Sequence, residues 1–210
     1  MQLVLGSSSP RRRELLALLG LSFEVCPPEF HEYPIIGAPP IEQVRYFARE
    51  KAKSVALVRP RALVLGSDTV IDVDGHLLGK PVDLEDARAM LTRLAGRSHR
   101  VHTAVALFDL ERHIESVEVA TAEVQMKADC DHAYERYLAS EESLGKAGAY
   151  AIQGLGENLV KRIDGDYTTV VGLPLKIVAN LLQSAGYPIE TNIDDLYRRK
   201  PYANWNRVAC

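Results

Sequence analysis

Residues 62–73 read Ala-Leu-Val-Leu-Gly-Ser-Asp-Thr-Val-Ile-Asp-Val, and this stretch does most to decide the fold. Its nearly unbroken apolar run is typical of a strand that is buried on both faces of a sheet. Asp74-Gly75 then predicts a tight hairpin turn, because these two residue types accept the backbone angles that such a turn requires. The chain is therefore expected to run through a central buried strand and to return along a short strand toward Lys80.

Helices and strands are expected to alternate on both sides of this strand. Before it, the pattern predicts a strand over 2–5, a helix over 10–19, a short strand over 23–26, a proline-rich loop over 27–40 and a helix over 41–57. After it, the pattern predicts a helix from Asp83 to Gly96, two strands within 99–126, a helix over 131–139, a strand over 159–163 and a helix from Pro174 to Gly186. This alternation favours an α/β fold with a mixed sheet.

Composition narrows the class of protein. With 47% apolar residues, 25% charged residues and a net charge of −3, the 210-residue chain is typical of a globular protein and carries no basic stripe for nucleic acid. Its widely spaced cysteines, Cys26, Cys130 and Cys210, match no metal or disulfide pattern and are expected to be reduced. No leader is expected, and no run reaches membrane-spanning length. A cytoplasmic protein is the expectation.

A serine turn followed by arginines marks the start of the first helix. Ser8 or Ser9 can cap this helix, and Pro10 suits its first position. A helix N-terminus attracts anions, so the arginines at 11–13 oppose the helix dipole unless a polyanion such as a chain of phosphates lies over the turn. The stretch therefore indicates either a phosphate site or a capped surface helix with solvated arginines.

Three titratable residues stand in unusual positions. Asp68 lies within the buried strand, where a carboxylate is costly unless a cation or several donors meet it. A facing lysine or a divalent metal would satisfy it, whereas the alternative is an aspartate bonded to neighbouring backbone. Lys51 falls on the apolar stripe of the helix over 41–57, either in a site or as a snorkelling lysine at its edge. Lys80 can face the same cleft as Asp68 across paired strands.

Several common catalytic motifs are absent. The chain has no Walker A motif, no Gly-x-Gly-x-x-Gly before a helix, no His-Glu-x-x-His, and no Gly-x-Ser-x-Gly around serines 7–9. His31 and Glu32 lie in the proline-rich loop, where an acid is most often merely solvated. The helix start, the buried acid and the lysines together indicate polyphosphate chemistry, which needs charge neutralisation, a metal and an aligned nucleophile.

Six motifs, in order and spacing, resemble those of the Maf nucleotide pyrophosphatases. They are Leu5-Gly-Ser-Ser-Ser-Pro-Arg-Arg, Ala48-Arg-Glu-Lys-Ala, Gly66-Ser-Asp-Thr-Val, Gly79-Lys-Pro, Gly148-Ala-Tyr-Ala-Ile-Gln-Gly and Val171-Gly-Leu-Pro-Leu. The resemblance predicts a Maf-like domain over 1–186, followed by a tail of unassigned role over 187–210. It implies a mixed sheet with flanking helices, shaped into two lobes around a deep cleft as in inosine-triphosphatase-like proteins, and a homodimer.

The resemblance also implies the reaction, which is cleavage of a nucleoside triphosphate between its α and β phosphates to give the monophosphate and pyrophosphate. Asp68 matches the proton acceptor of the family, and Arg12, Lys51 and Lys80 match further catalytic positions. Ser9 and Arg12 match phosphate-binding positions. Glu32 and Asp68 match positions for a divalent cation, Mg²⁺ or Mn²⁺.

Three positions resemble the sites that select the nucleotide. Arg11, Thr69 and Gln153 match the members that act on dTTP and UTP. The members that act on 7-methyl-GTP carry a bulky aromatic residue, a glutamine and a glutamate there. An amide such as that of Gln153 can both donate to and accept from a pyrimidine edge, whereas a glutamate suits a cationic methylated purine.

Two alternatives remain open at this point. Gly66-Ser67 and Gly79 are closer to the 7-methyl-GTP branch, and His31 stands where an acid is common, so a 7-methyl-GTP pyrophosphatase is the first alternative. The second is a non-catalytic nucleotide-binding regulator of cell division, which would bind dTTP without releasing pyrophosphate. A nucleic-acid-binding module is disfavoured by the charge.

Overall fold

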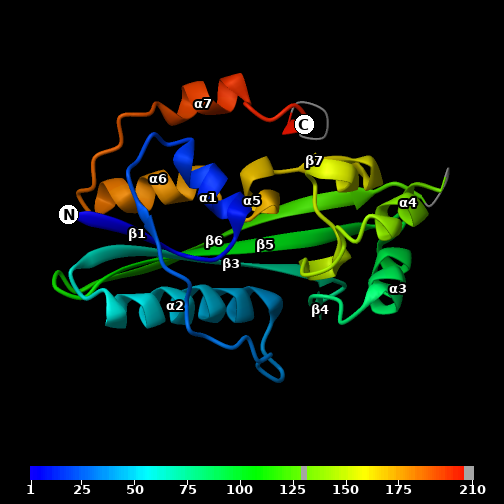
Figure 1. Cartoon of the computed structure of the whole chain (residues 1–210), viewed down its shortest axis with the longest axis horizontal. Helices are drawn as coiled ribbons and strands as arrows, with labels where there is room; N and C mark the ends of the chain where they lie inside the picture. Colours follow the sequence, from blue (N-terminus) through cyan, green and yellow to red (C-terminus); the bar gives the residue numbers. More distant parts are fainter. Residues whose placement is uncertain (129–131, 206–210) are drawn as a thin grey trace.

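The computed structural model describes residues 1–128 and 132–205, and within them the chain forms a seven-stranded mixed sheet (Figure 1). Its order is β2-β1-β3-β5-β6-β7, with β4 paired to β3 beside this path. The strands are β1 (Gln2–Gly6), β2 (Glu24–Val25), β3 (Ala62–Val73), β4 (His76–Leu78), β5 (Ser98–Asp109), β6 (Ile114–Met126) and β7 (Val160–Asp164). Strand β1 runs parallel to β2 and β3, and the other pairings are antiparallel. The expected mixed sheet is confirmed.

Helices cover both faces of this sheet (Figure 1). They are α1 (Pro10–Ala17), α2 (Pro40–Val58), α3 (Leu84–Leu94), α4 (Ala133–Ala139), α5 (Tyr167–Val171), α6 (Leu175–Ser184) and α7 (Ile193–Arg199), with 3₁₀ turns η1 (Ala147–Ala149) and η2 (Gly154–Leu159). Of the expected helix over 131–139, residue 131 lies outside the described residues, as do Cys130 and Cys210. Within 1–128 and 132–205, no helix is long and apolar enough to span a bilayer.

Helix α2 lies close against one face of the sheet. Its apolar stripe packs with small and branched side chains of the strands in one cluster, which includes Val4, Val44, Phe47, Ala48, Ala52, Val64, Ala104 and Ala106. Gly66 permits the close approach, because a Cβ at this position would lie 2.7 Å from the Ala52 Cβ and 2.9 Å from the Ala48 carbonyl oxygen. The glycine therefore sets the height of α2 above β3.

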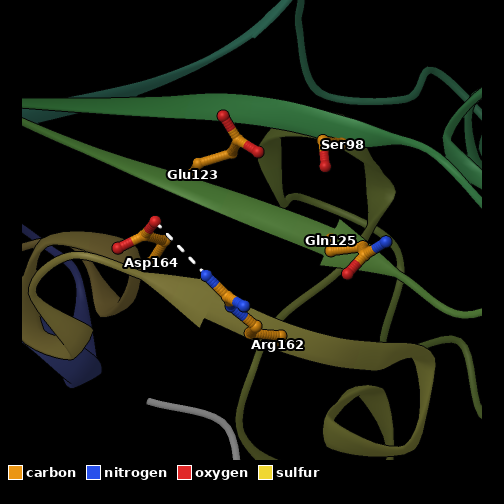
Figure 2. A pocket seen from close by; sticks show the side chains of 5 residues that line it. All are labelled: Ser98, Glu123, Gln125, Arg162 and Asp164. Carbon is orange, nitrogen blue, oxygen red and sulfur yellow. Dashed lines mark hydrogen bonds and ion pairs between the residues drawn. The ribbon is translucent and has the colours of Figure 1, made fainter. Parts of the chain in front are cut away.

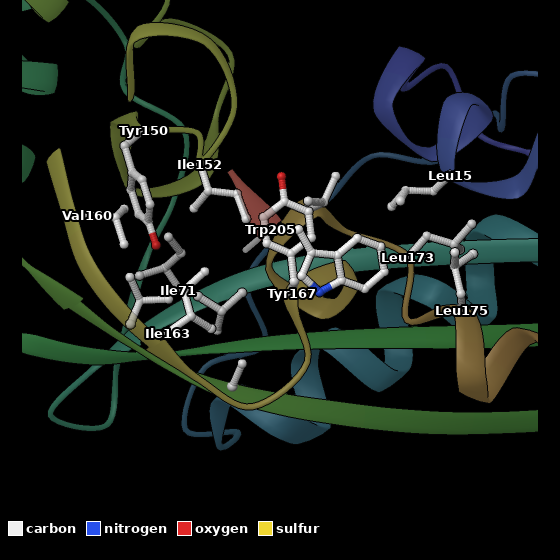
Figure 3. Close-up of a cluster of buried hydrophobic side chains, with 14 of the residues drawn as sticks. Leu15, Ile71, Tyr150, Ile152, Val160, Ile163, Tyr167, Leu173, Leu175 and Trp205 are labelled. Carbon is white, nitrogen blue, oxygen red and sulfur yellow. The ribbon is translucent and has the colours of Figure 1, made fainter. Parts of the chain in front are cut away.

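The opposite face carries the larger apolar core, which Figure 3 shows in part. Helices α1, α5 and α6 pack here, and the chain beyond the expected domain returns to the same core. Trp205 is 2% exposed, and its ring stacks on that of Tyr167 with centroids 5.0 Å apart. Residues 187–205 are therefore packed against the core, an arrangement that the sequence pattern did not predict.

One edge of β3 is left open between two partner strands. Strand β1 ends where Gly6 pairs with Gly66, and β4 begins to pair with β3 only at Ile71. In the described pairings, residues 67–70 thus have a strand neighbour on the β5 side alone. The turn after β1 and the start of α1 lie at this gap. Carboxyl ends of parallel strands are common ligand sites in α/β sheets, so the gap is where a site is expected.

Candidate active site

Asp68, Lys51 and Glu32 form a buried ion cluster on the α2 side of β3. The Lys51 ammonium donates to Asp68 Oδ1 and to Glu32 Oε1, the latter at 2.5 Å. The side chains of Lys51 and Asp68 are only 9% and 6% exposed. Lys80 reaches the cluster from the solvent side, with its Nζ 3.7 Å from Glu32 Oε1. Lys80 was expected to face the same cleft as Asp68, and it is linked to Asp68 through Glu32 and Lys51.

Local structure explains why the lysine and the aspartate meet. Side chains alternate along a strand, so Asp68 lies on the same face of β3 as Gly66, beneath α2. Lys51 follows Phe47 by one helical turn and is therefore on the inner face of α2. Because Lys51 is buried and points at a carboxylate, the snorkelling alternative is wrong. Asp68 is met by a lysine rather than by neighbouring backbone.

The two carboxyl groups of the cluster differ in proton affinity. Burial raises the pKa of Asp68, and the positive charges of Lys51 and Arg12 oppose this rise only in part. Burial alone would raise the pKa of Glu32 too, but the hydrogen bond from Lys51 and the charges of Lys51, Lys80 and Arg12 lower it overall. Asp68 Oδ2 is buried and has no hydrogen-bond partner among the described residues. Such divergent environments are how a site separates a proton-accepting carboxylate from one that stays ionised.

Arg12 approaches the gap from the other face of β3. Its Nε donates to the Gly172 carbonyl oxygen at 2.9 Å, and its terminal nitrogens donate to Thr69 Oγ1 at 3.2 Å and Ser7 Oγ at 3.4 Å. Ser67 donates to the same Gly172 oxygen at 3.1 Å. Burial lowers the pKa of Arg12, while the charge of Asp68 opposes this, so the guanidinium and the carboxylate lie within electrostatic reach of each other.

A glycine is needed at the point where Arg12 is held. Gly172 has φ +117°, which other residues rarely adopt, and a Cβ there would lie 3.2 Å from Thr69 Oγ1. Gly172 lies in the motif that begins at Val171, but the sequence analysis predicted no role for it. The sequence analysis also missed Ser7, which accepts a hydrogen bond from Arg12, and Ser67, which donates to the Gly172 carbonyl oxygen. Nothing local in the sequence distinguishes these two residues from ordinary turn and strand serines.

The start of α1 has the expected cap. Ser9 is the N-cap residue, with Oγ 3.5 Å from the Arg12 backbone nitrogen, and Pro10 occupies the first turn. Burial lowers the pKa of Arg11, and the surrounding Tyr137 and Glu14 oppose this. Since Arg11 and Arg12 are half-buried and Arg13 is exposed, the reading as solvated arginines fits Arg13 alone.

The three residues expected to select the nucleotide lie on separate segments around this site. Thr69 contacts Arg12 directly. Arg11 interacts with Tyr137, whose hydroxyl accepts a hydrogen bond from the Ala151 backbone nitrogen at 3.2 Å, close to Gln153 in the chain. Gln153 is half-buried between η1 and η2.

The carboxylates near Lys51 determine what kind of metal site is possible here. Among the described residues, no group of three or more His, Cys, Asp or Glu side chains could enclose a cation. Two carboxylates, Glu32 and Asp68, meet at Lys51, and Asp68 keeps one oxygen without a partner. Mg²⁺ is commonly held by one or two carboxylates together with substrate phosphates. The donors fit a cation that arrives with a nucleotide and do not fit an all-protein cage.

A separate polar hollow lies over β5, β6 and β7, as Figure 2 shows. It has a volume of about 240 Å³ and is lined by Ser98, Glu123, Gln125, Arg162 and Asp164. The Arg162–Asp164 ion pair crosses it at 3.4 Å. Asp68 pairs with Ala104 in the middle of β5, whereas this hollow lies at the start of β5, so the two are distinct. None of the expected site residues lines it.

Comparison with known proteins identifies the family of this chain. The family model described as "Maf-like protein" matches residues 2–185. Proteins named dTTP/UTP pyrophosphatase are similar: that of Myxococcus xanthus is 48% identical over 89% of this chain and 94% of its own length, and that of Pelotomaculum thermopropionicum is 44% identical over 90% and 98%. The Staphylococcus aureus Ham1 protein superposes with a TM-score of 0.51 over 88% of this chain and 97% of its own, at 14% identity, which shows a shared fold. The chain belongs to the Maf family.

Proposed function

We propose that the protein hydrolyses nucleoside triphosphates, with dTTP and UTP as its substrates, to the monophosphate and pyrophosphate. The observation that carries this proposal is Asp68, a buried carboxylate on the open stretch of β3. It is bonded to Lys51, and its Oδ2 has no hydrogen-bond partner among the described residues. Relatives that are 44% and 48% identical and named for these two nucleotides support the substrate pair.

In this proposal, Asp68 accepts the proton of the attacking water. Its raised pKa suits a group that must take up a proton during the reaction, because burial increases the proton affinity of the carboxylate. Lys51 orients Asp68 through its hydrogen bond and also holds Glu32. The lysine therefore keeps the base aligned while its charge lies close to the negative charge that develops on the phosphates.

Phosphate binding falls to the start of α1 and the cations around it. Ser9 caps the helix, and the positive end of the helix dipole beside it favours an anion. Arg12 is held by uncharged oxygens, so its positive charge is available to a phosphate. Lys80, whose side chain is 57% exposed, approaches from the opposite side. These groups can neutralise a triphosphate from two directions.

Glu32 and Asp68 would hold the divalent cation, Mg²⁺ or Mn²⁺, together with the phosphates of the substrate. The bound cation would neutralise phosphate charge and so ease attack by water. Arg11, Thr69 and Gln153 would distinguish the base. A cytoplasmic homodimer completes the proposal, and light scattering of the purified protein tests the dimer.

The decisive variant is Asp68→Asn, which keeps the shape of the side chain and removes its ability to accept a proton. We expect pyrophosphate release from dTTP and UTP to fall by at least about 100-fold, the range typical of a general base. Circular dichroism and thermal unfolding should show a retained fold. Asp164→Asn changes an exposed acid in the separate hollow and is the matched control, with activity unchanged. Wild-type turnover by the Asp68→Asn protein would refute the role of the base.

The same assay separates the alternative functions. A panel of dTTP, UTP and 7-methyl-GTP, with Mg²⁺ or Mn²⁺ and pyrophosphate as the readout, ranks the substrates by kcat/KM. A clear preference for 7-methyl-GTP would replace the proposed substrates. Binding of dTTP without any pyrophosphate release would instead favour a regulator.

A further inference from the structure

Two routes of hydrogen bonds connect the Arg12 side chain to α5. The first is direct, because Arg12 Nε donates to the carbonyl oxygen of Gly172, the residue that caps the end of this helix. The second passes through Thr69, which accepts from Arg12 and has its Oγ1 2.9 Å from Thr103 Oγ1. Thr103 in turn donates to the Thr169 carbonyl oxygen at 2.7 Å. The position of α5 therefore sets the position of the guanidinium.

Helix α5 is too short to fix this position by itself. It has five residues, and so short a helix is marginal unless other segments pack on it. Thr168 shapes its end, because the Thr168 carbonyl oxygen accepts from the backbone nitrogens of Gly172 and Leu173. Thr168 Oγ1 also accepts from the Leu175 backbone nitrogen at 3.1 Å. These bonds define the turn from which the Gly172 carbonyl reaches Arg12.

The segment over 187–205, here called the terminal segment, lies beyond the matched family region and holds Thr168 from outside. Its residue Tyr197 lies in α7, with the hydroxyl 2.9 Å from Thr168 Oγ1. Thr168 gives its own hydroxyl proton to the Asp166 carboxylate at 2.6 Å, so Tyr197 is the donor of this pair. Thr168 Oγ1 then accepts two hydrogen bonds and donates one, which is its full capacity. Removing the Tyr197 hydroxyl leaves a fully buried oxygen without one of its donors.

The terminal segment is also fastened at points away from Thr168. The Trp205 ring stacks on that of Tyr167, with centroids 5.0 Å apart (Figure 3). Thr191 donates to the Leu19 carbonyl oxygen at 2.7 Å, just beyond the end of α1 that is farther from Arg12. Because these contacts do not involve the Tyr197 hydroxyl, removal of that hydroxyl should leave α7 in place.

We propose that Tyr197 is a positioning residue for Arg12. Its hydroxyl stabilises the arrangement of α5 in which the Gly172 carbonyl accepts from Arg12 Nε, and this bond directs the guanidinium toward the phosphates of the substrate. Tyr197 acts through Thr168 and needs no contact with the substrate. The link from the guanidinium to the phosphates rests on the proposed function, whereas the link from Tyr197 to Arg12 does not.

The hydrogen bond of Arg12 can be followed by NMR in the protein without substrate. The Arg12 Nε–H is bonded to a buried carbonyl, so it should exchange slowly with water, and the absence of its signal from Arg12→Lys assigns it. Tyr197→Phe should speed this exchange by about fivefold, the usual contribution of one hydrogen bond. Thr191→Val is the matched control, since it also removes one hydroxyl of the terminal segment. It should lower the unfolding temperature and leave the exchange unchanged.

The consequence for phosphate binding is measured by calorimetry of dTTP with Mg²⁺ in the Asp68→Asn protein. Tyr197→Phe should weaken the affinity by about fivefold, again the contribution of one hydrogen bond. Combined with Arg12→Lys, it should cost no more than Arg12→Lys alone, because the tyrosine acts through the arginine. Thr191→Val should leave the affinity unchanged.

Four results would each overturn the inference. They are a rapidly exchanging Arg12 Nε–H in the wild type, an unchanged exchange rate in Tyr197→Phe, an equal acceleration in Thr191→Val, and additive losses of dTTP affinity in the double variant. Absence of pyrophosphate release by the wild type would instead contradict the proposed function. The exchange measurement needs no turnover, so the two failures can be told apart.

Discussion

The two faces of β3 differ sharply at neighbouring residues. On the α2 face, Asp68 is buried against the ammonium of Lys51, which also holds Glu32. On the opposite face, Thr69 contacts Arg12, and within the described residues the guanidinium donates to the uncharged oxygens of Gly172, Ser7 and Thr69. One face therefore buries charges that pair directly with one another, and the other face holds a cation by hydrogen bonds to uncharged oxygens.

This difference separates two tasks that a single surface would combine poorly. A carboxylate that must accept a proton benefits from burial, and a paired lysine keeps that burial tolerable. A cation that must bind phosphate benefits from neutral partners, since a carboxylate on Arg12 would compete with the substrate. In the proposed function, the open edge of β3 between β1 and β4 would let both faces serve one site.

Removing the Lys51–Asp68 ion pair on the α2 face of β3 should give the largest loss of activity and stability. Lys51→Met keeps a long apolar side chain and leaves Asp68 buried without its cation. We expect kcat to fall by more than about 100-fold and the free energy of unfolding to fall by about 3 kcal/mol, as for other broken buried pairs. Steady-state kinetics and urea titration measure the two changes. Lys161→Met, on an exposed position of β7, is the control, and comparable losses in both variants would contradict the comparison.

Removing the hydrogen bonds of Arg12 on the opposite face of β3 should give a smaller loss of activity, which appears mainly as a higher KM. Arg12→Lys keeps the charge but cannot reach the Gly172 carbonyl, Thr69 and Ser7 together. A reduction in kcat/KM of about 30-fold is expected, from hydrogen bonds to a charged group worth about 2 kcal/mol. The neighbouring Arg13→Lys changes an exposed arginine and should stay near wild type. If the two substitutions had equal effects, the anchoring role of Arg12 would be wrong.

A second titratable side chain with an uncharged partner, His99, is buried at the start of β5. His99 is 4% exposed, its Nε2 lies 2.7 Å from the Tyr150 hydroxyl, and its Nδ1 has no partner among the described residues. Burial lowers the pKa of this imidazole to about 4 from an ordinary 6.5. The unfolded chain therefore binds one more proton than the folded chain between these pH values, and stability present above pH 6.5 is lost as the pH falls toward 4.

The smallest predicted effect follows from this imidazole. His99→Gln should remove the acid-linked loss, which amounts to about 1 kcal/mol over the first pH unit below 6.5. Urea unfolding at pH 7.5 and pH 5.5 measures the difference for each protein. His76→Gln replaces an exposed histidine and should keep the wild-type dependence. If the free energy of unfolding of His99→Gln depended on pH as that of the wild type does, the idea that His99 is buried in its uncharged form would be wrong.

Much of the fold could be predicted from local patterns. The strand expected over 62–73 is β3 (Ala62–Val73), and the helix expected over 41–57 is α2 (Pro40–Val58). The cap at Ser9 also follows the prediction. These features are encoded within a few consecutive residues, by alternation, by helical periodicity or by a single capping side chain, and so they can be read without knowledge of distant contacts.

The sequence alone thus determined the elements, the family resemblance and the identity of the unusual side chains such as Asp68 and Lys51. Only the tertiary structure decided that Lys51 binds both Asp68 and Glu32, that Asp68 and Thr69 lie at one gap on opposite faces of β3, and that Asn204 returns to the core and donates to the Ile152 carbonyl oxygen. The physical reason is that these contacts join segments far apart in the chain, and their partners are chosen by how helices and loops pack on the sheet rather than by any local spacing.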